Sequence, residues 1–245
     1  MAGHDFRTPR LFLTSNLATG AEPELTKGQA NYLLNALRLS AGDAVLAFNG
    51  RDGEWLSRLA GDKRRPRLAV ESRTRPQSEG TNLVYAFAPL KHTRLDYMVQ
   101  KAVEMGAAVL APVLTQHTQV TRVNLDRMRA NVIEAAEQCG ILSIPRVDEP
   151  TTLDRFIAGI AGDAVLVFCD EEAGAQDPIA ALAASPAGPI VLLVGPEGGF
   201  AESERRALLD RERVVRLSLG PRILRADTAA VAALAIVQAA RGDWR

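Results

Sequence analysis

The feature that most constrains this chain is the alternation, after Thr81, of short apolar runs with longer amphipathic segments. Apolar runs such as residues 83–90 and 190–194 are typical of strands that are buried on both faces. The segments 92–107 and 124–140 each carry an apolar stripe at helical spacing, and a glycine stands near the end of each. Strands that alternate with helices predict an α/β fold with a parallel sheet.

The first third of the chain has a different pattern. Residues 10–75 read as mostly β, because short strand-like runs are separated by turn-forming residues and interrupted by one helical piece at 28–43. Several short strands with a single helix predict a small β-barrel. The polar stretch 73–82 (RTRPQSEGTN) is the best candidate linker. We therefore expect a β-barrel domain over 1–75 and an α/β domain over 76–245.

Charge gives a local signal and no global one. The chain has 29 basic and 29 acidic residues, so its net charge predicts no nucleic-acid partner. Between Arg58 and Arg75, however, there are seven basic residues, including Lys63, and only two acidic ones, Asp62 and Glu71. Such a run is a candidate footprint for phosphates. A solvated β-turn with charged flanks also explains it.

Several classes of protein are disfavoured by what the sequence contains. Cys139 and Cys169 are too few for a disulfide scaffold or a four-thiolate zinc site. His4, His92 and His117 are far apart and have no acidic or thiol partner at metal-ligand spacing, so we expect no metal. The start of the chain lacks an apolar signal core, and no run approaches the roughly 18 apolar residues of a membrane span. We expect a cytoplasmic protein.

Two apolar strand-like runs end in a Gly-Pro turn with charged residues nearby. One is 190–200 (IVLLVGPEGGF) and the other is 214–230 (VVRLSLGPRILRADTAA), while a third run ends at 170–172 in three carboxylates. Ligands of open α/β sheets bind beyond the carboxyl ends of the strands. A tight turn into a helix would explain one such loop, but the pair favours a ligand site.

Known phosphate and nucleophile motifs do not account for these loops. No Gly-Lys-Ser/Thr follows the glycines, as a P-loop requires, and the spacing does not fit the dinucleotide fingerprint. A Gly-x-Ser-x-Gly nucleophile elbow is also absent from the sequence. What remains is a pocket of main-chain amides and carbonyls, which suits a nucleoside-like cofactor.

The two loops together resemble the paired signature of SPOUT-superfamily RNA methyltransferases. With the stretches 37–55, 92–107 and 134–140, the chain resembles the RsmE family over nearly its whole length. The resemblance implies methylation of N3 of a uridine in 16S ribosomal RNA, with S-adenosylmethionine as cofactor and S-adenosylhomocysteine as product. It further implies an N-terminal PUA-like barrel that holds RNA, a deep trefoil knot in the parallel sheet, and a homodimer. The partner would be 16S ribosomal RNA or the 30S subunit, without membrane or metal.

The resemblance also implies roles for individual residues. The expected cofactor-binding residues are Phe168, Asp170, Val194, Gly195, Pro196, Glu197, Gly198, Gly199, Leu217, Leu219, Gly220, Pro221, Ile223 and Leu224. The expected RNA-binding residues are Arg10, Arg38, Arg64, Arg65 and Arg222.

For catalysis we expect Arg225, together with Glu197 and Asp227. Arg225, with Arg222, would face the uracil oxygens where negative charge develops. Glu197 or Asp227 would act as the base or orient that arginine. A phosphate clamp, or a salt bridge that closes the knot, is the alternative role for each arginine.

The chain departs from the family pattern at several positions. Asp227 stands where relatives usually have Glu, which shortens the carboxylate. Ile141 replaces a usual Arg, so one expected basic contact is missing. Asn31 and Tyr32 stand where relatives often have His, which argues against a barrel-edge RNA contact there. Ala201 replaces the usual Ser or Thr cap, although nearby acidic residues would still favour the helix dipole.

Other functions remain open from the sequence. Another SPOUT enzyme that methylates a ribose 2′-oxygen or a different base, in ribosomal or transfer RNA, would share the cofactor site. An RNA-binding protein without enzymatic activity would keep the barrel and the basic run but would not bind S-adenosylmethionine. A dehydrogenase would bind nicotinamide nucleotides, which the missing fingerprint argues against.

Overall fold

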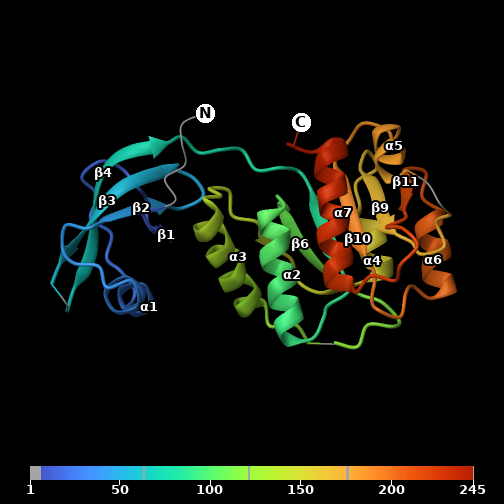
Figure 1. Ribbon diagram of the computed structural model, residues 1–245, viewed down its shortest axis with the longest axis horizontal. Coiled ribbons are helices and arrows are strands. Elements are labelled where there is room, and N and C mark those ends of the chain that lie inside the picture. Colours follow the sequence, from blue (N-terminus) through green and yellow to red (C-terminus); the bar gives the residue numbers. More distant parts are fainter. Residues whose placement is uncertain (1–6, 63, 121, 175–176, 245) are drawn as a thin grey trace. The chain divides into compact units, whose positions relative to one another are not determined.

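The protein consists of two compact units, which we describe separately from a computed structural model (Figure 1). The first unit comprises Met1–Glu79 and Ala136–Ile144, and the second comprises Gly80–Ala135 and Pro145–Arg245. His4 and Lys63 lie outside the described residues, which are 7–62, 64–120, 122–174 and 177–244.

The first unit is built on a four-stranded sheet in the order β1-β2-β3-β4. β1 and β2 pair in parallel, whereas β2, β3 and β4 pair antiparallel. Leu33 from the helical segment 27–36 packs against this sheet in a buried cluster. The strands are β1 (Arg10–Phe12), β2 (Ala44–Phe48), β3 (Glu54–Gly61) and β4 (Pro66–Arg75).

The helical piece predicted over 28–43 is shorter and less regular than expected. α1 (Lys27–Asn31) begins after Thr26, whose side chain accepts a hydrogen bond from the Gln29 amide. It continues as one π-helical turn, Tyr32–Ala36, and ends there. Arg38 then adopts a left-handed φ of 58°, which a continuing helix does not allow.

Residues 136–144 belong to the first unit through hydrogen bonds with its sheet. The Phe12 amide donates to the Glu137 carboxylate at 2.8 Å. The Arg75 guanidinium donates to the Gly140 carbonyl at 2.9 Å. Because Arg75 is the last residue of β4, part of the predicted linker is in fact a strand.

The second unit contains the predicted parallel sheet, in the order β11-β9-β10-β5-β6-β7. Every pair in this sheet is parallel, and β8 also pairs with β6 in parallel. The prediction of an α/β fold with a parallel sheet is therefore confirmed. The strands are β5 (Val84–Phe87), β6 (Val109–Leu114), β7 (Arg146–Val147), β8 (Thr151–Thr152), β9 (Val165–Cys169), β10 (Ile190–Val194) and β11 (Val214–Leu217).

Helices cover both faces of this sheet. α7 contacts α2, α5 and β10, whereas α4 and α6 contact each other and add buried leucines to the cluster on the opposite face. Much of α7 is buried, and most of its buried residues are alanines. The helices are α2 (His92–Glu104), α3 (Leu125–Cys139), α4 (Leu153–Gly159), α5 (Pro178–Ala183), α6 (Glu202–Leu209) and α7 (Ala226–Arg241).

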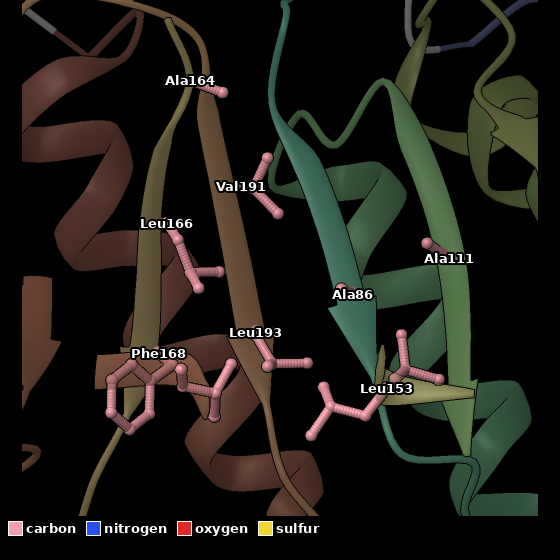
Figure 2. Close-up of a cluster of buried hydrophobic side chains, with 10 residues drawn as sticks. Ala86, Ala111, Leu153, Ala164, Leu166, Phe168, Val191 and Leu193 are labelled. Atoms are coloured by element: carbon pink, nitrogen blue, oxygen red, sulfur yellow. The ribbon is translucent and has the colours of Figure 1, made fainter. Parts of the chain in front are cut away.

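The core between the sheet, α4 and α6 fixes the carboxyl ends of the central strands. Leu166 and Phe168 of β9 lie beside Val191 and Leu193 of β10, and Leu153 of α4 packs against this cluster (Figure 2). All five side chains are buried. Burying each large apolar side chain contributes about 1.5–3 kcal/mol, so the strand ends form a rigid base for the loops beyond them. In the described chain no helix combines the length and hydropathy that crossing a bilayer requires.

Candidate functional site

A pocket of about 450 Å³ lies beyond the carboxyl ends of β9, β10 and β11. This volume is within the range of small-molecule and cofactor sites. The three loops that the sequence singled out, at 169–172, 194–200 and 217–224, supply most of its lining. The chain thus brings together segments that are far apart in sequence, at the edge of the sheet where ligands of such folds bind.

Most of the predicted cofactor residues line this pocket. Only Phe168 and Gly198 of that set do not. Phe168 is fully buried and meets the Phe200 ring edge-to-face, with ring centroids 6.0 Å apart. The predicted RNA contact Arg222 lines the pocket, whereas Arg225 and Asp227 do not.

The glycines of the first loop have separate structural reasons. A Cβ at Gly195 would lie 2.8 Å from two atoms of the Phe200 ring, closer than carbon atoms pack. Gly199 adopts a left-handed φ of 70°. His117 Nδ1 lies 3.2 Å and 3.1 Å from the carbonyl oxygens of Gly198 and Gly199. The loop is therefore closely packed on one side while its other side lines the pocket.

The second loop leaves its main chain free of internal partners. In the described structure, no residue from Ser218 to Leu224 donates or accepts a main-chain hydrogen bond within the protein. Residues 220–223 are exposed and the whole loop lines the pocket, so these amides and carbonyls are accessible to a polar ligand. This observation fits a nucleoside, whose base edge offers both donors and acceptors.

Asp170 is a buried carboxylate in the pocket wall. Its side chain is 4% exposed and accepts hydrogen bonds from Arg205 and Arg216, the latter at 2.7 Å. Burial alone would raise the pKa of Asp170, but the hydrogen bonds from the two arginines outweigh it and hold the pKa below its ordinary value. Burial, with Asp170 next to it, raises the pKa of Cys169 to about 12, so this thiol stays protonated at neutral pH.

Arg94 of α2 connects the two predicted catalytic carboxylates. Its guanidinium donates to both Asp227 oxygens, at 3.0 Å and 3.1 Å, and also to Glu197. The hydrogen bonds that Arg94 donates to Asp227 lower the pKa of Asp227, and the bonds that it donates to Asp227 and Glu197 raise its own pKa. Both carboxylates thus orient Arg94 and not Arg225.

Sequence reasoning missed Arg94, although one signal was present. Arg94 stands in the first turn of α2, where a cation opposes the helix dipole. Such a residue needs a carboxylate partner from elsewhere in the fold. By contrast, Arg222 and Arg225 are exposed and have no ion-pair partner among the described residues.

The predicted RNA-binding residues of the first unit differ in exposure. Arg38, Arg64 and Arg65 are exposed. Arg10 is not, because its side chain is 4% exposed and pairs with the equally buried Glu54 at 3.1 Å. The structure therefore gives Arg10 a role inside the unit and corrects its assignment as an RNA contact.

Ion pairs also reduce the free charge of the basic run. Three arginines of the run form ion pairs with carboxylates of the same unit: Arg58 with Glu71, Arg67 with Glu22, and Arg75 with Glu54. Arg64, Arg65 and Arg73 are exposed and have no ion-pair partner among the described residues, so they remain for an external anion.

The structure also describes the positions at which this chain differs from the family pattern. Ala201 precedes α6 without a side-chain cap, and the Glu204 carboxylate instead accepts from the Ala201 amide at 2.9 Å. Ile141 is half-buried and Asn31 is exposed. Across the described ranges, no cluster of His, Cys, Asp and Glu could hold a metal ion.

Comparison with known proteins agrees with this architecture. Residues 77–238 match the family model described as an RNA methyltransferase domain, and residues 25–71 match an RNA methyltransferase PUA domain. The chain is 31% identical, over 94% of both sequences, to ribosomal RNA small subunit methyltransferase E of Rickettsia conorii.

Two solved structures cover almost the whole chain. One is ribosomal RNA small subunit methyltransferase E from Neisseria gonorrhoeae bound to S-adenosylmethionine, with 27% identity, a TM-score of 0.85, and coverage of 95% of this chain and 98% of that one. The other is a methyltransferase from Legionella pneumophila with bound S-adenosylmethionine, with 28% identity, a TM-score of 0.81, and coverage of 96% and 98%. The chain therefore belongs to the ribosomal RNA small subunit methyltransferase E (RsmE) family of RNA methyltransferases.

Proposed function

We propose that this protein transfers a methyl group from S-adenosylmethionine to N3 of one uridine in 16S ribosomal RNA. The observation that carries the proposal is the pocket beyond β9, β10 and β11, whose second loop leaves its main-chain groups free. Membership of the RsmE family supports the substrate class.

The residues of the pocket fit the cofactor. Its volume of about 450 Å³ suits a nucleoside with an amino-acid tail, and the free amides and carbonyls of 218–224 suit the edge of an adenine. The exposed Glu171 carboxylate lines the same pocket, has no ion pair among the described residues and suits a cationic ligand, whereas Glu172 pairs with Arg205. When bound, S-adenosylmethionine supplies an activated methyl group.

The chain's own residues must position the uridine and manage one proton. A uridine N3 is protonated at neutral pH, so its proton must leave before or during methyl transfer. Arg225 is exposed and unpaired among the described residues, which leaves its guanidinium free to stabilise negative charge on the uracil oxygens. Glu197 or Asp227 is the proposed proton acceptor or orienting carboxylate.

The proposed function also implies roles for the two domains and for a second copy of the chain. We place domain limits at 1–75 and 76–245, with the PUA-like domain holding RNA and the parallel sheet knotted around the cofactor loops. The enzyme would act as a homodimer on 16S ribosomal RNA or the 30S subunit, and hence in the cytoplasm.

Nucleoside analysis of 16S ribosomal RNA from cells with and without this protein tests the activity. We expect 3-methyluridine to disappear from the RNA of cells that lack it and to return when the gene is restored. Loss of a ribose-methylated nucleoside instead would assign the chain to the ribose 2′-O reaction. Unchanged modification of both ribosomal and transfer RNA would overturn the proposal and leave an RNA-binding role.

Replacing Arg225 with Ala tests the proposed catalytic group. We expect Arg225→Ala to lower the rate at saturating RNA by about 100-fold or more, the usual effect of removing one donor to developing charge. Cofactor affinity should stay close to that of the unmodified chain. Arg206→Ala, an exposed arginine of α6, serves as the control. An unchanged rate at saturating RNA would remove Arg225 from the mechanism.

A further inference from the structure

The guanidinium of Arg94 contacts two separate segments of the proposed active site. Arg94 contacts Glu197, which lies within the glycine loop after β10, and Asp227, which lies in the first turn of α7. These carboxylates are 103 and 133 residues from Arg94 in sequence. The loop and the helix are thus tied to the same point on α2.

The geometry of the contact restricts motion of the α7 end. Arg94 holds both oxygens of Asp227 in a two-pronged arrangement, which fixes orientation as well as distance. The Asp227 side chain is only 18% exposed, and its Oδ1 also accepts from the Thr228 amide at 2.9 Å. Arg225, the residue before α7, is two positions away.

Arg94 thus bridges Asp227 and Glu197, and of these two carboxylates Glu197 is the more exposed. The Glu197 side chain is 47% exposed, and the second oxygen of its carboxylate has no hydrogen bond in the described structure. Pro196 and Glu197 line both the large pocket and a second, smaller one that also contains Arg94. The bridge therefore runs through the wall between the two pockets.

We propose that Arg94 is a positioning residue of the methyl-transfer site, which locks the glycine loop and the start of α7 in one arrangement. It acts through Glu197 and Asp227 and does not itself contact the reacting atoms. Asp227 is then an anchor, and Glu197, with its free oxygen, is the carboxylate left to accept a proton. This inference rests on the proposed function.

Arg94→Lys tests the proposal because it keeps the charge and removes the two-pronged contact. We expect affinity for S-adenosylhomocysteine, measured by calorimetry, to fall at least about tenfold, together with a lower kcat. KM for RNA should not change. The matched control is Arg127→Lys, since Arg127 makes a similar two-pronged contact with Asp96 away from the pocket.

The outcomes separate this inference from the proposed function. Wild-type affinity and kcat in Arg94→Lys would overturn the inference, as would a change in KM for RNA alone, which would make Arg94 an RNA contact. An unmodified chain that binds no S-adenosylhomocysteine would overturn the proposed function itself.

A double-mutant cycle keeps the inference testable even if Arg94→Lys is poorly folded. Glu197→Gln and Asp227→Asn change groups that meet only through Arg94. Their effects on cofactor affinity should be non-additive by at least about threefold. Strictly additive effects would show that no coupling passes through Arg94 and would overturn the inference.

Discussion

Gly195 shows how a single missing side chain shapes the site. It follows directly after β10, and the Phe200 ring occupies the space that a Cβ would need. Phe200 in turn rests on Phe168 in the core of the sheet. The loop can therefore fold back over the strand end only while residue 195 has no side chain.

Gly195→Ala should damage the cofactor pocket. The added Cβ must displace the Phe200 ring, and overpacking of this kind costs about 1–3 kcal/mol. We expect a lower melting temperature and weaker binding of S-adenosylhomocysteine, measured by thermal unfolding and calorimetry. Gly162→Ala is the control, because nothing lies within 4 Å of a Cβ there. Identical behaviour of the two variants would refute this explanation of Gly195.

At the residue scale, the sequence predicted the glycine-containing loops of the pocket. It did not predict ion pairs between residues that are far apart in the chain. Glycines that follow apolar strands indicated where the pocket loops would lie. The pairing of Arg94 with carboxylates more than 100 residues away has no local pattern. The buried ion pair of Arg10 with Glu54 could not be predicted either, because these residues are 44 positions apart in the sequence.

At the scale of elements, periodic segments were predicted well and short ones were not. The helices at 92–104 and 125–139 follow clear apolar stripes, and both end close to a left-handed glycine. α4 and α5 were not predicted, although Pro178 after the capping residue Asp177 is a recognisable helix start. Each has seven residues or fewer, too few for a stripe to stand out.

β3 contributes a buried carboxylate, Glu54, to the first unit. Its carboxylate pairs with Arg10 and Arg75 and also accepts from the Thr74 hydroxyl at 2.9 Å. Burial alone would raise the pKa of Glu54, but hydrogen bonds from Arg75, Thr74 and Arg10 outweigh it and lower the pKa below the ordinary value of 4.5. Glu54 therefore stabilises the fold above that pH, and this contribution is lost as the pH falls through the lowered pKa.

Glu54→Gln should unfold the first unit more easily at neutral pH. Removing one partner of a buried ion pair typically costs about 3–5 kcal/mol, because the remaining charge stays buried without compensation. Denaturant unfolding followed by the fluorescence of Trp55, the next residue in β3, measures the effect. The difference from the unmodified chain should shrink as the pH falls below 4.5.

Glu71→Gln is the matched control for this experiment. Glu71 lies on β4 and pairs with Arg58, but both side chains are more than 40% exposed. Exposed pairs of this kind contribute about 0–1 kcal/mol. Equal destabilisation by the two variants would show that burial of the Glu54 pair is not what stabilises the unit.

At the scale of the whole molecule, zero net charge conceals an uneven distribution. The basic run of the first unit is a candidate footprint for phosphates or a solvated turn, and ion pairs occupy several of its members. Arg64 and Arg65 remain exposed in the turn between β3 and β4. Their amides donate to Asp62, which fixes the turn and leaves both side chains facing solvent.

The salt dependence of RNA binding measures how many phosphates this turn neutralises. Each lysine or arginine that contacts a phosphate of single-stranded RNA adds about 0.7 to the slope of log K against log salt concentration. Arg64→Ala/Arg65→Ala should therefore weaken RNA binding and reduce that slope by about 1.4, whereas cofactor affinity stays the same. Arg155→Ala/Arg206→Ala removes two exposed arginines from α4 and α6 and should leave the slope nearly unchanged. Equal slopes for both double variants and the unmodified chain would mean that the turn is solvated and contacts no phosphate, and RNA recognition would then have to rest on other residues.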